Sequence, residues 1–295
     1  METARNLRIT AFSDKGATRS NNEDNLYASC WPLVNPLSLD SVEASETIEY
    51  TSDWFVAAVF DGMGGADDGE LASLCAARTM PALVEKLAEK DECTQAELQG
   101  VLREIKDEIE REIRKEATNE QGQMPGTTCC GFAMKDGWLV PFWIGDSRMY
   151  LLRKGKFYLM TKDHTVAQEK IDQGEVTENE AKTLRSWHYI TAYIGDERTD
   201  FSVDKGFALE PGDKILLCTD GVSDEFTDGQ IADYMVQPYE EAKEEMLNKI
   251  RESGDDNATA LLIEYISEGE QKSAGVKRIE RLKENVLNLF TNKLK

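Results

Sequence analysis

The sequence predicts a protein of the α+β class, and three stretches carry this prediction. Residues 70–117 show the apolar spacing of two consecutive helices. Residues 126–161 contain short strand-like runs separated by tight turns, as in an antiparallel succession of strands. The continuous apolar run 55–60 is typical of a strand buried on both faces. Helices and strands therefore occur in separate blocks, which is the pattern of an α+β fold.

The first part of the chain is expected to hold short strands around a polar segment. Residues 13–25 are polar and place Arg19 shortly before Glu23 and Asp24. Residues 30–53 contain prolines and scattered acids, and we expect a loop or a variable hairpin there. The expected strands of this part are 7–12, 26–29 and 55–60.

Two helices are expected next. Residues 70–90 have helical apolar spacing, and Pro81 should kink or divide that helix. Residues 94–117 begin with a capping box formed by Thr94 and Glu97. One face of this second helix is an apolar stripe. Its opposite face is rich in Glu, Lys and Arg, and we expect it to be a solvated surface.

The second half of the chain is expected to consist mainly of strands. Residues 126–161 should form one antiparallel meander, and 163–187 a polar, helix-prone flap exposed to solvent. A helix is expected over 228–253. The expected strands are 127–133, 138–144, 149–153, 156–161, 189–194, 201–203, 214–219 and 258–265.

Length and composition indicate a globular protein with a distinct tail. The chain has 295 residues, 40% hydrophobic and 31% charged, which allows one large domain or two small ones with ample core. We assign 1–268 to one domain, with the flap inside it, and 269–295 to a basic amphipathic C-terminal helix or tail. The tail either packs on the domain or docks on a partner or an acidic lipid surface.

The formal net charge of −22 restricts the partners of the protein. It disfavours nucleic acid, whose phosphates bind basic surfaces. It would also repel a phosphate substrate unless bound divalent cations inverted the local field. The six cysteines form no CxxC pair beside histidines, which indicates buried free thiols in a reducing cytosol rather than a zinc site. Without a signal-peptide region or a run of about 18 apolar residues, we expect a cytoplasmic protein.

Carboxylates recur where the expected strands begin or end. Asp61 and Asp220 each follow a strand and precede a glycine. Asp146 lies between two strands, and Asp256 precedes the last one. For Asp61 alone, a plain Asp-Gly turn is the simpler interpretation. If these carboxylates converge, their oxygens suit a pair of Mg²⁺ or Mn²⁺ ions, which would activate a water against a phosphoryl group held by an arginine.

Seven short motifs occur in order from about residue 8 to 265. They are Arg19-x-x-Asn22-Glu23-Asp24, Asp61-Gly62-Met63-Gly64-Gly65, Gly126-Thr127-Thr128, Gly145-Asp146-Ser147-Arg148, Asp163-His164-Thr165, Thr219-Asp220-Gly221-Val222-Ser223-Asp224 and Asp256-Asn257-Ala258-Thr259. Each motif alone is weak, but the ordered set resembles the metal-dependent protein phosphatase 2C family, particularly its bacterial members. The resemblance implies a four-layer α-β-β-α sandwich, with two antiparallel sheets flanked by helix pairs. It also implies hydrolysis of phosphoserine and phosphothreonine in proteins.

The same resemblance implies roles in catalysis and in binding two Mn²⁺ or Mg²⁺ ions. Asp61 would bridge the two ions and take part in catalysis, and Gly62 would offer its carbonyl oxygen. Asp220 and Asp256 would complete the shell of the first ion. Arg19 would bind the phosphate of the substrate.

A further set of acids is implied to surround these ions. Glu23 and Asp24 would hold metal-bound waters. Asp146, with Asp220 and Asp224, would hold a weaker third ion. From the sequence alone, Asp224 fits a helix N-cap about as well as a metal ligand.

Met63 is a departure from part of the family. Some members carry a histidine at this place, which is proposed as the general acid for the leaving alcohol, and methionine cannot donate that proton. Other members, chiefly bacterial, share the methionine. We therefore expect a metal-bound water to protonate the leaving group.

Three other residues are expected to be structural. His164, between a strand and a helix, should act as a structural cap, and His188 should pack beside Trp187. Arg148 should pair with a carboxylate, and we leave it outside the site.

Together these features predict a Mn²⁺- or Mg²⁺-dependent serine/threonine phosphatase. Its partners would be phosphoproteins made by a serine/threonine kinase, and it would act as a cytoplasmic monomer, with membrane contact through the tail left open. One alternative is a non-catalytic member of the fold, a pseudophosphatase that binds a partner, although every expected acid is present. The other is a metal-dependent hydrolase of small phosphate esters or nucleotides.

Overall fold

The computed structural model describes most of the chain. The described residues are 5–30, 40–50, 53–64, 69–116, 124–181, 183–184 and 186–266. The expected tail at 269–295 and Gly65 of the glycine-rich turn lie outside them. Within the described part, no helix is both long and apolar enough to cross a membrane.

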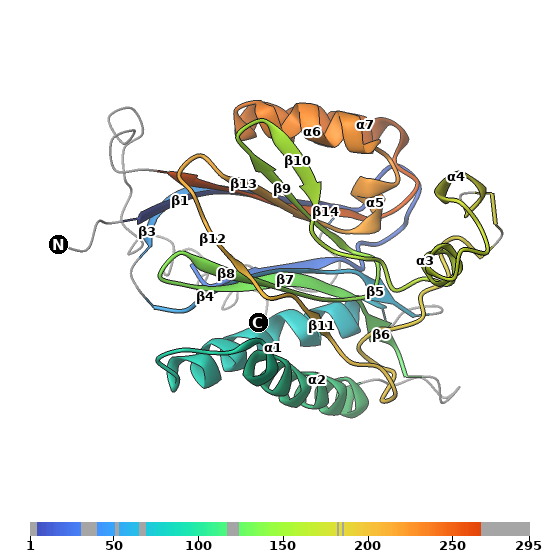
Figure 1. The fold of residues 1–295 in the computed structure, drawn as a ribbon. Helices are drawn as coiled ribbons and strands as arrows, with labels where there is room; N and C mark the ends of the chain where they lie inside the picture. The colour runs from blue at the N-terminus through green and yellow to red at the C-terminus, as the bar shows by residue number, and fades with distance from the viewer. Residues whose placement is uncertain are drawn as a thin grey trace, which may run out of the picture.

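The elements form four layers (Figure 1). Two six-stranded antiparallel sheets pack face to face. Helices α1 (Gly69–Ala88) and α2 (Gln95–Glu116) cover the outer face of one sheet. Helices α6 (Asp228–Val236) and α7 (Tyr239–Ser253) cover the outer face of the other. This arrangement confirms the α-β-β-α sandwich.

The first sheet pairs the first described strand of the chain with the last one. Its order is β10 (Lys156–Leu159), β9 (Arg148–Arg153), β13 (Lys214–Cys218), β14 (Ala258–Ile266), β1 (Arg5–Asp14) and β3 (Ser41–Tyr50). Asp14, the last residue of β1, lies opposite Ala258, the first residue of β14. The turn after β1 therefore lies beside the residues that precede β14.

The second sheet contains the expected buried strand. Its order is β11 (Ser202–Val203), β8 (Trp138–Ile144), β7 (Cys129–Lys135), β4 (Phe55–Phe60) and β2 (Asn25–Ala28), with β12 (Phe207–Ala208) also paired to β8. All six residues of β4 are buried. Val56 and Phe60 pack toward α1 and α2, whereas Phe55 and Val59 face the other sheet. Burial of this strand on both faces is confirmed.

The expected loop or variable hairpin at 30–53 contains a long strand. Its residues 41–50 form β3, which pairs with β1 along its whole length. Glu43 and Glu46 lie on this strand, which is at the edge of the sheet. Charged side chains are common on edge strands because they discourage pairing with other chains. Glu43 and Glu46, which contributed to the expectation of a loop, are therefore residues of an edge strand.

The expected single meander over 126–161 is wrong. Its strands form two hairpins, β7–β8 and β9–β10, that belong to different sheets. The chain crosses between the sheets at Gly145, whose φ of 104° and close approach to Thr128 leave no room for a side chain. Asp146 is the next residue, so the crossing places its carboxylate at the end of both sheets.

Two other expectations also fail. Residues 189–194 form isolated bridges, of Ile190 to Thr165 and of Ile194 to Thr127, rather than a strand. The expected helix at 228–253 is divided into α6 and α7, because Pro238 stands between them and cannot continue α6. Helix α1, by contrast, is one helix that contains Pro81.

Helix α2 begins as expected, with its capping box formed. The backbone N–H and the hydroxyl of Thr94 both donate to Glu97 Oε2, at 2.9 and 2.8 Å. Its polar face, however, is not solvated throughout. Lys106 and Glu110 are buried, and Lys106 Nζ lies 2.6 Å from Glu110 Oε1. Lys106 Nζ also donates to the carbonyl of Asp196 at 2.9 Å, which ties α2 to the segment that follows Ile194.

Two short helices, α3 (Val166–Asp172) and α4 (Glu178–Ala181), extend beyond the sandwich (Figure 1). They lie at the end of the molecule that also carries the ribbon of β5 (Gly62–Met63) and β6 (Gly126–Thr127) and the short helix α5 (Asp220–Ser223). This end also holds the expected acids Asp61, Asp146 and Asp220.

Candidate metal centre

The connections between strands bring the expected acids to one end of the sandwich. Asp61 directly follows β4, and Asp220 follows β13 by two residues. Asp24 directly precedes β2, and Asp256 precedes β14. Asp146 lies in the crossing between the sheets. These carboxylates come from both sheets, and their charges interact across the interface between them.

Asp61 is fixed through its backbone. Its N–H donates to Thr128 Oγ1 at 3.0 Å, and its carbonyl accepts from Thr127 Oγ1 at 2.8 Å. Burial raises the pKa of the Asp61 carboxyl well above its ordinary value, and the negative charges of Asp220 and Asp24 add to this effect. The chain holds this acid rigidly and makes its negative charge unfavourable unless a cation is near.

Asp24 and Asp220 show the same crowding. Thr219 Oγ1 donates to Asp24 Oδ2 at 2.8 Å. Burial raises the pKa of Asp24 well above its ordinary value, with a further contribution from Asp220. Burial also raises the pKa of Asp220 to about 6, and the charges of Asp256 and Asp224 act in the same direction.

Three buried carboxylate oxygens fit a cation site. Asp24 Oδ1, Asp146 Oδ1 and Asp220 Oδ1 have no hydrogen-bond partner among the described residues. A buried polar atom without a partner is destabilising, and a charged one more so. An all-oxygen donor set of several carboxylates is the set that Mg²⁺ and Mn²⁺ favour. The residues present therefore fit divalent cations.

Gly62 and Gly69 allow the backbone to approach Glu23. A side chain on Gly62 would clash with the carbonyl of Gly69, and one on Gly69 would clash with the Glu23 carboxylate. The start of α1 can therefore lie directly against Glu23 and Gly62. Burial raises the pKa of Glu23, while a hydrogen bond from Asn21 opposes the rise.

Arg19 lies at the rim of this cluster. Its Nη2 donates to Asp256 Oδ2 at 2.6 Å, and its Nε donates to the carbonyl of Asp255 at 3.3 Å. About half of the Arg19 side chain is exposed. The guanidinium is thus open to a ligand from solvent, although its Nη2 is engaged by Asp256, an expected metal ligand.

Asn257 has a larger structural role than its motif suggested. Its Oδ1 accepts from the N–H of Glu23 at 2.8 Å. Its Nδ2 donates to the carbonyls of Lys15 and Asn21, at 3.0 and 2.8 Å. One amide therefore fixes the turn that carries Arg19 and Glu23 onto the start of β14. The sequence placed Asn257 beside Asp256, but only the structure shows what it binds.

Asp224 does not cap the start of a helix. It is the C-cap of α5, and the N-cap of α6 is Thr227. Its Oδ2 lies 3.4 Å from Nδ1 of His188. The His188 ring does contact Trp187, edge to face with centroids 6.4 Å apart, but 63% of its side chain is exposed. The expectation that His188 only packs therefore misses its contact with Asp224.

Arg148 and His164 brace the crossing that carries Asp146. Arg148 pairs with Asp163 through Nε and Nη2, at 3.0 and 2.6 Å, so its expected structural pairing is confirmed. His164 Nδ1 accepts from the N–H of Gly145 at 3.2 Å, and its Nε2 lies 3.0 Å from Ser202 Oγ. His164 is structural, although Thr165 rather than His164 is the N-cap of α3.

Comparisons with known proteins agree with this geometry. PstP, a serine/threonine protein phosphatase of Mycobacterium tuberculosis, is 30% identical over 265 residues, which are 88% of this chain and 45% of PstP. The protein phosphatase PhpP of Streptococcus pneumoniae is 28% identical over 265 residues, which are 87% of this chain and 97% of PhpP. The chain therefore spans about half the length of PstP and nearly all of PhpP.

A solved structure and a family profile extend the likeness. The crystal structure of the PstP catalytic domain in complex with two manganese ions matches with a TM-score of 0.69 and 28% identity, over 89% of this chain and 100% of that one. The sequence profile described as Protein phosphatase 2C matches residues 40–262, which is most of the chain. The fold, the ordered motifs and this match agree, and the chain belongs to the protein phosphatase 2C family.

Proposed function

We propose that the protein is a Mn²⁺- or Mg²⁺-dependent serine/threonine protein phosphatase. The observation that carries the proposal is the cluster of buried carboxylates beside the half-exposed guanidinium of Arg19, in which three carboxylate oxygens lack a hydrogen-bond partner within the described ranges. Relatives named as protein phosphatases, and the two manganese ions of the PstP catalytic domain, support it.

In this proposal Asp61, Asp220 and Asp256 hold two cations with the carbonyl of Gly62. When bound, such cations supply Lewis acidity, which lowers the pKa of a water and offsets the charge of a phosphate ester. The hydrogen bonds to the backbone of Asp61 fix the position from which its short side chain extends, which limits where the carboxylate can lie.

The remaining acids surround this pair. Glu23 and Asp24 would hold the water ligands of the cations, and Asp146 and Asp224 would contribute to a weaker third site. Arg19 would use its planar fork to bind two phosphate oxygens. To do so it would exchange its contact with Asp256 for the substrate.

Three finer points belong to the same proposal and rest on the sequence. The substrates would be phosphoproteins made by a serine/threonine kinase. The protein would act as a monomer in the cytoplasm. Residues 269–295 would pack on the domain or make contacts with a partner or membrane.

The test is release of phosphate from a phosphothreonine peptide by metal-free protein to which Mn²⁺ is added back. We expect turnover with Mn²⁺, none with EDTA, and loss of most turnover at limiting Mn²⁺ in Asp220→Asn. Absence of metal-dependent turnover on any ester would favour the binding-module alternative. Faster turnover of nucleotides or small aryl phosphates than of phosphopeptides would favour the small-ester hydrolase.

A further inference from the structure

His188 meets two of the site aspartates at the surface of the cluster. Its Nδ1 lies 3.4 Å from Asp224 Oδ2. One ligand atom from each of His188, Asp220 and Asp224 lies within 4.8 Å of the other two. An imidazole and two carboxylates at this separation can all reach a single ion, because ligand atoms around one metal lie a few ångströms apart.

A buried acid whose charge acts on two of these residues supports the same site. Only 6% of Asp146 is exposed, and its Oδ1 has no hydrogen-bond partner among the described residues. The charge of Asp146 interacts with the charges of Asp220 and Asp224. The histidine therefore adds a nitrogen donor to a group that already contains an unsatisfied buried carboxylate.

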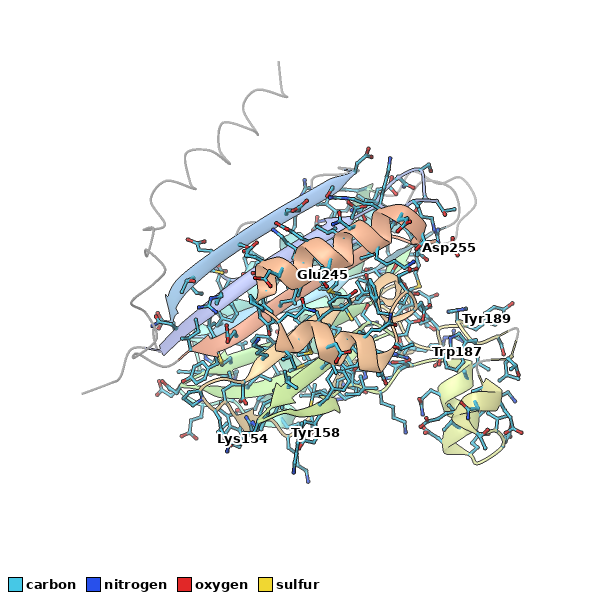
Figure 2. All side chains as sticks on the ribbon, turned by 90° about the horizontal axis from the view of Figure 1, so that it is seen from above. Lys154, Tyr158, Trp187, Tyr189, Glu245 and Asp255 are labelled. Carbon is cyan, nitrogen blue, oxygen red and sulfur yellow. The ribbon has the colours of Figure 1, made fainter. Side chains whose placement is uncertain are left out.

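The backbone around His188 is fixed on both sides. The N–H of Tyr189 donates to the carbonyl of Ser186 at 3.1 Å, and the carbonyl of Tyr189 accepts from the N–H of Val166 at 2.9 Å. The N–H of Thr191 donates to the carbonyl of His164 at 2.8 Å. The last two of these bonds join residues 189–191, which follow α4, to residues 164–166, which lead into α3. Figure 2 places Trp187 and Tyr189 between that unit and the sandwich.

We propose that His188 donates an imidazole nitrogen to a transition-metal ion held together with Asp220 and Asp224. A mixed nitrogen and oxygen donor set favours Mn²⁺, Co²⁺ or Zn²⁺ over Mg²⁺, which takes oxygen almost exclusively. The ion would link the α3–α4 unit to the catalytic cluster through one side chain. The proposal shares Asp220 and Asp224 with the proposed phosphatase site and adds His188 to them, and its test measures binding and needs no turnover.

The first experiment measures metal binding to the metal-free full chain by isothermal titration with Zn²⁺, Mn²⁺ and Mg²⁺. We expect His188→Gln to weaken one Zn²⁺ and one Mn²⁺ site by at least about tenfold and to leave Mg²⁺ binding unchanged. Tyr189→Phe, a neighbouring exposed position, is the matched control and should bind as the parent does. His188→Asp replaces nitrogen with oxygen and should shift the preference of that site toward Mg²⁺.

The second experiment follows the imidazole resonances by NMR, which is direct because the chain has only two histidines. Stoichiometric Zn²⁺ should shift the His188 signals, while those of His164, bonded to Gly145 and Ser202, should stay in place. Unchanged Zn²⁺ affinity in His188→Gln, or His188 signals that do not respond to Zn²⁺, would overturn the proposal. Either result leaves the phosphatase assay as a separate test, since that assay can succeed or fail with His188 unbound.

Discussion

At the scale of single residues, the site contains more buried negative charge than its hydrogen-bonding groups can stabilise. Thr219, Thr128 and Asn257 position the acids through hydrogen bonds, yet three carboxylate oxygens have no partner in the part of the chain that the structure describes. Without a cation, each buried carboxylate therefore destabilises the fold that contains it. This makes the acids candidates for substitutions that remove activity and raise stability together.

Asp220→Asn should show the gain in stability that accompanies the loss of activity. A carboxyl whose pKa is raised on folding favours the folded state at low pH and loses that contribution as the pH rises, here between 3.8 and about 6. In EDTA at pH 7.5 the variant should therefore be more stable than the parent, by about 1–2 kcal/mol. The gain should vanish below about pH 4. Urea unfolding at several pH values measures it, and a variant less stable at pH 7.5 would contradict the account.

Met63→His tests the leaving-group chemistry. Met63 lies on β5, next to Gly62, with its side chain partly exposed. A histidine there has an ordinary pKa of about 6.5 and can donate a proton near neutral pH. We expect the variant to gain a new limb in the pH dependence of kcat that Met63→Leu lacks. An unchanged profile would show that position 63 takes no part in proton transfer.

The sequence was sufficient to name the acids that the structure brings to one end of the sandwich, because they belong to ordered motifs and most stand beside a strand. Their roles as metal ligands stay a prediction. The sequence was not sufficient to predict the contact of His188 with Asp224 or the long-range hydrogen bonds of Asn257. His188 follows the α3–α4 unit in the chain and contacts Asp224 of the sandwich, and Asn257 bonds to residues 236 and 242 positions away. Contacts of this kind follow from tertiary placement, which no local pattern encodes.

At the scale of elements, strand positions were predicted better than strand partners. A tight turn between two runs predicts a hairpin, and β7–β8 and β9–β10 are hairpins. The turn at Gly145 looks similar in sequence, but there the chain leaves one sheet for the other. Likewise, the charged face of α2 was expected to be solvated, but Lys106 and Glu110 on it are buried. The periodicity of a helix shows which residues share a face, and it does not show which loop covers that face.

The buried pair on α2 should be sensitive to loss of one partner. Lys106→Met leaves the Glu110 carboxylate buried, with Arg114 3.8 Å away as a weaker partner. We expect a loss of about 3 kcal/mol in the free energy of unfolding. The double variant Lys106→Met/Glu110→Leu should recover much of that loss because no charge is left buried. A single variant within about 1 kcal/mol of the parent would contradict this.

At the scale of the whole molecule, charge should shape substrate choice. The net charge of −22 gives a negative field around the site that we propose receives a phosphate. Phosphopeptides with basic flanking residues should therefore have a higher kcat/KM than acidic ones at low salt. The ratio should approach one as salt shortens the Debye length from about 30 Å toward about 3 Å. A ratio independent of ionic strength would show that local contacts dominate.

The crossing at Gly145 also has a consequence for the lifetime of the folded state. The acids span Glu23 to Asp256 and meet only when both sheets have docked. Such long-range closure comes late in folding, so a transition state would lack a complete set of ligands. Mn²⁺ should then slow unfolding and leave the rate of refolding nearly unchanged, as stopped-flow measurements can check. In a cell, the supply of metal would set how long each molecule survives proteolysis as well as how fast it works.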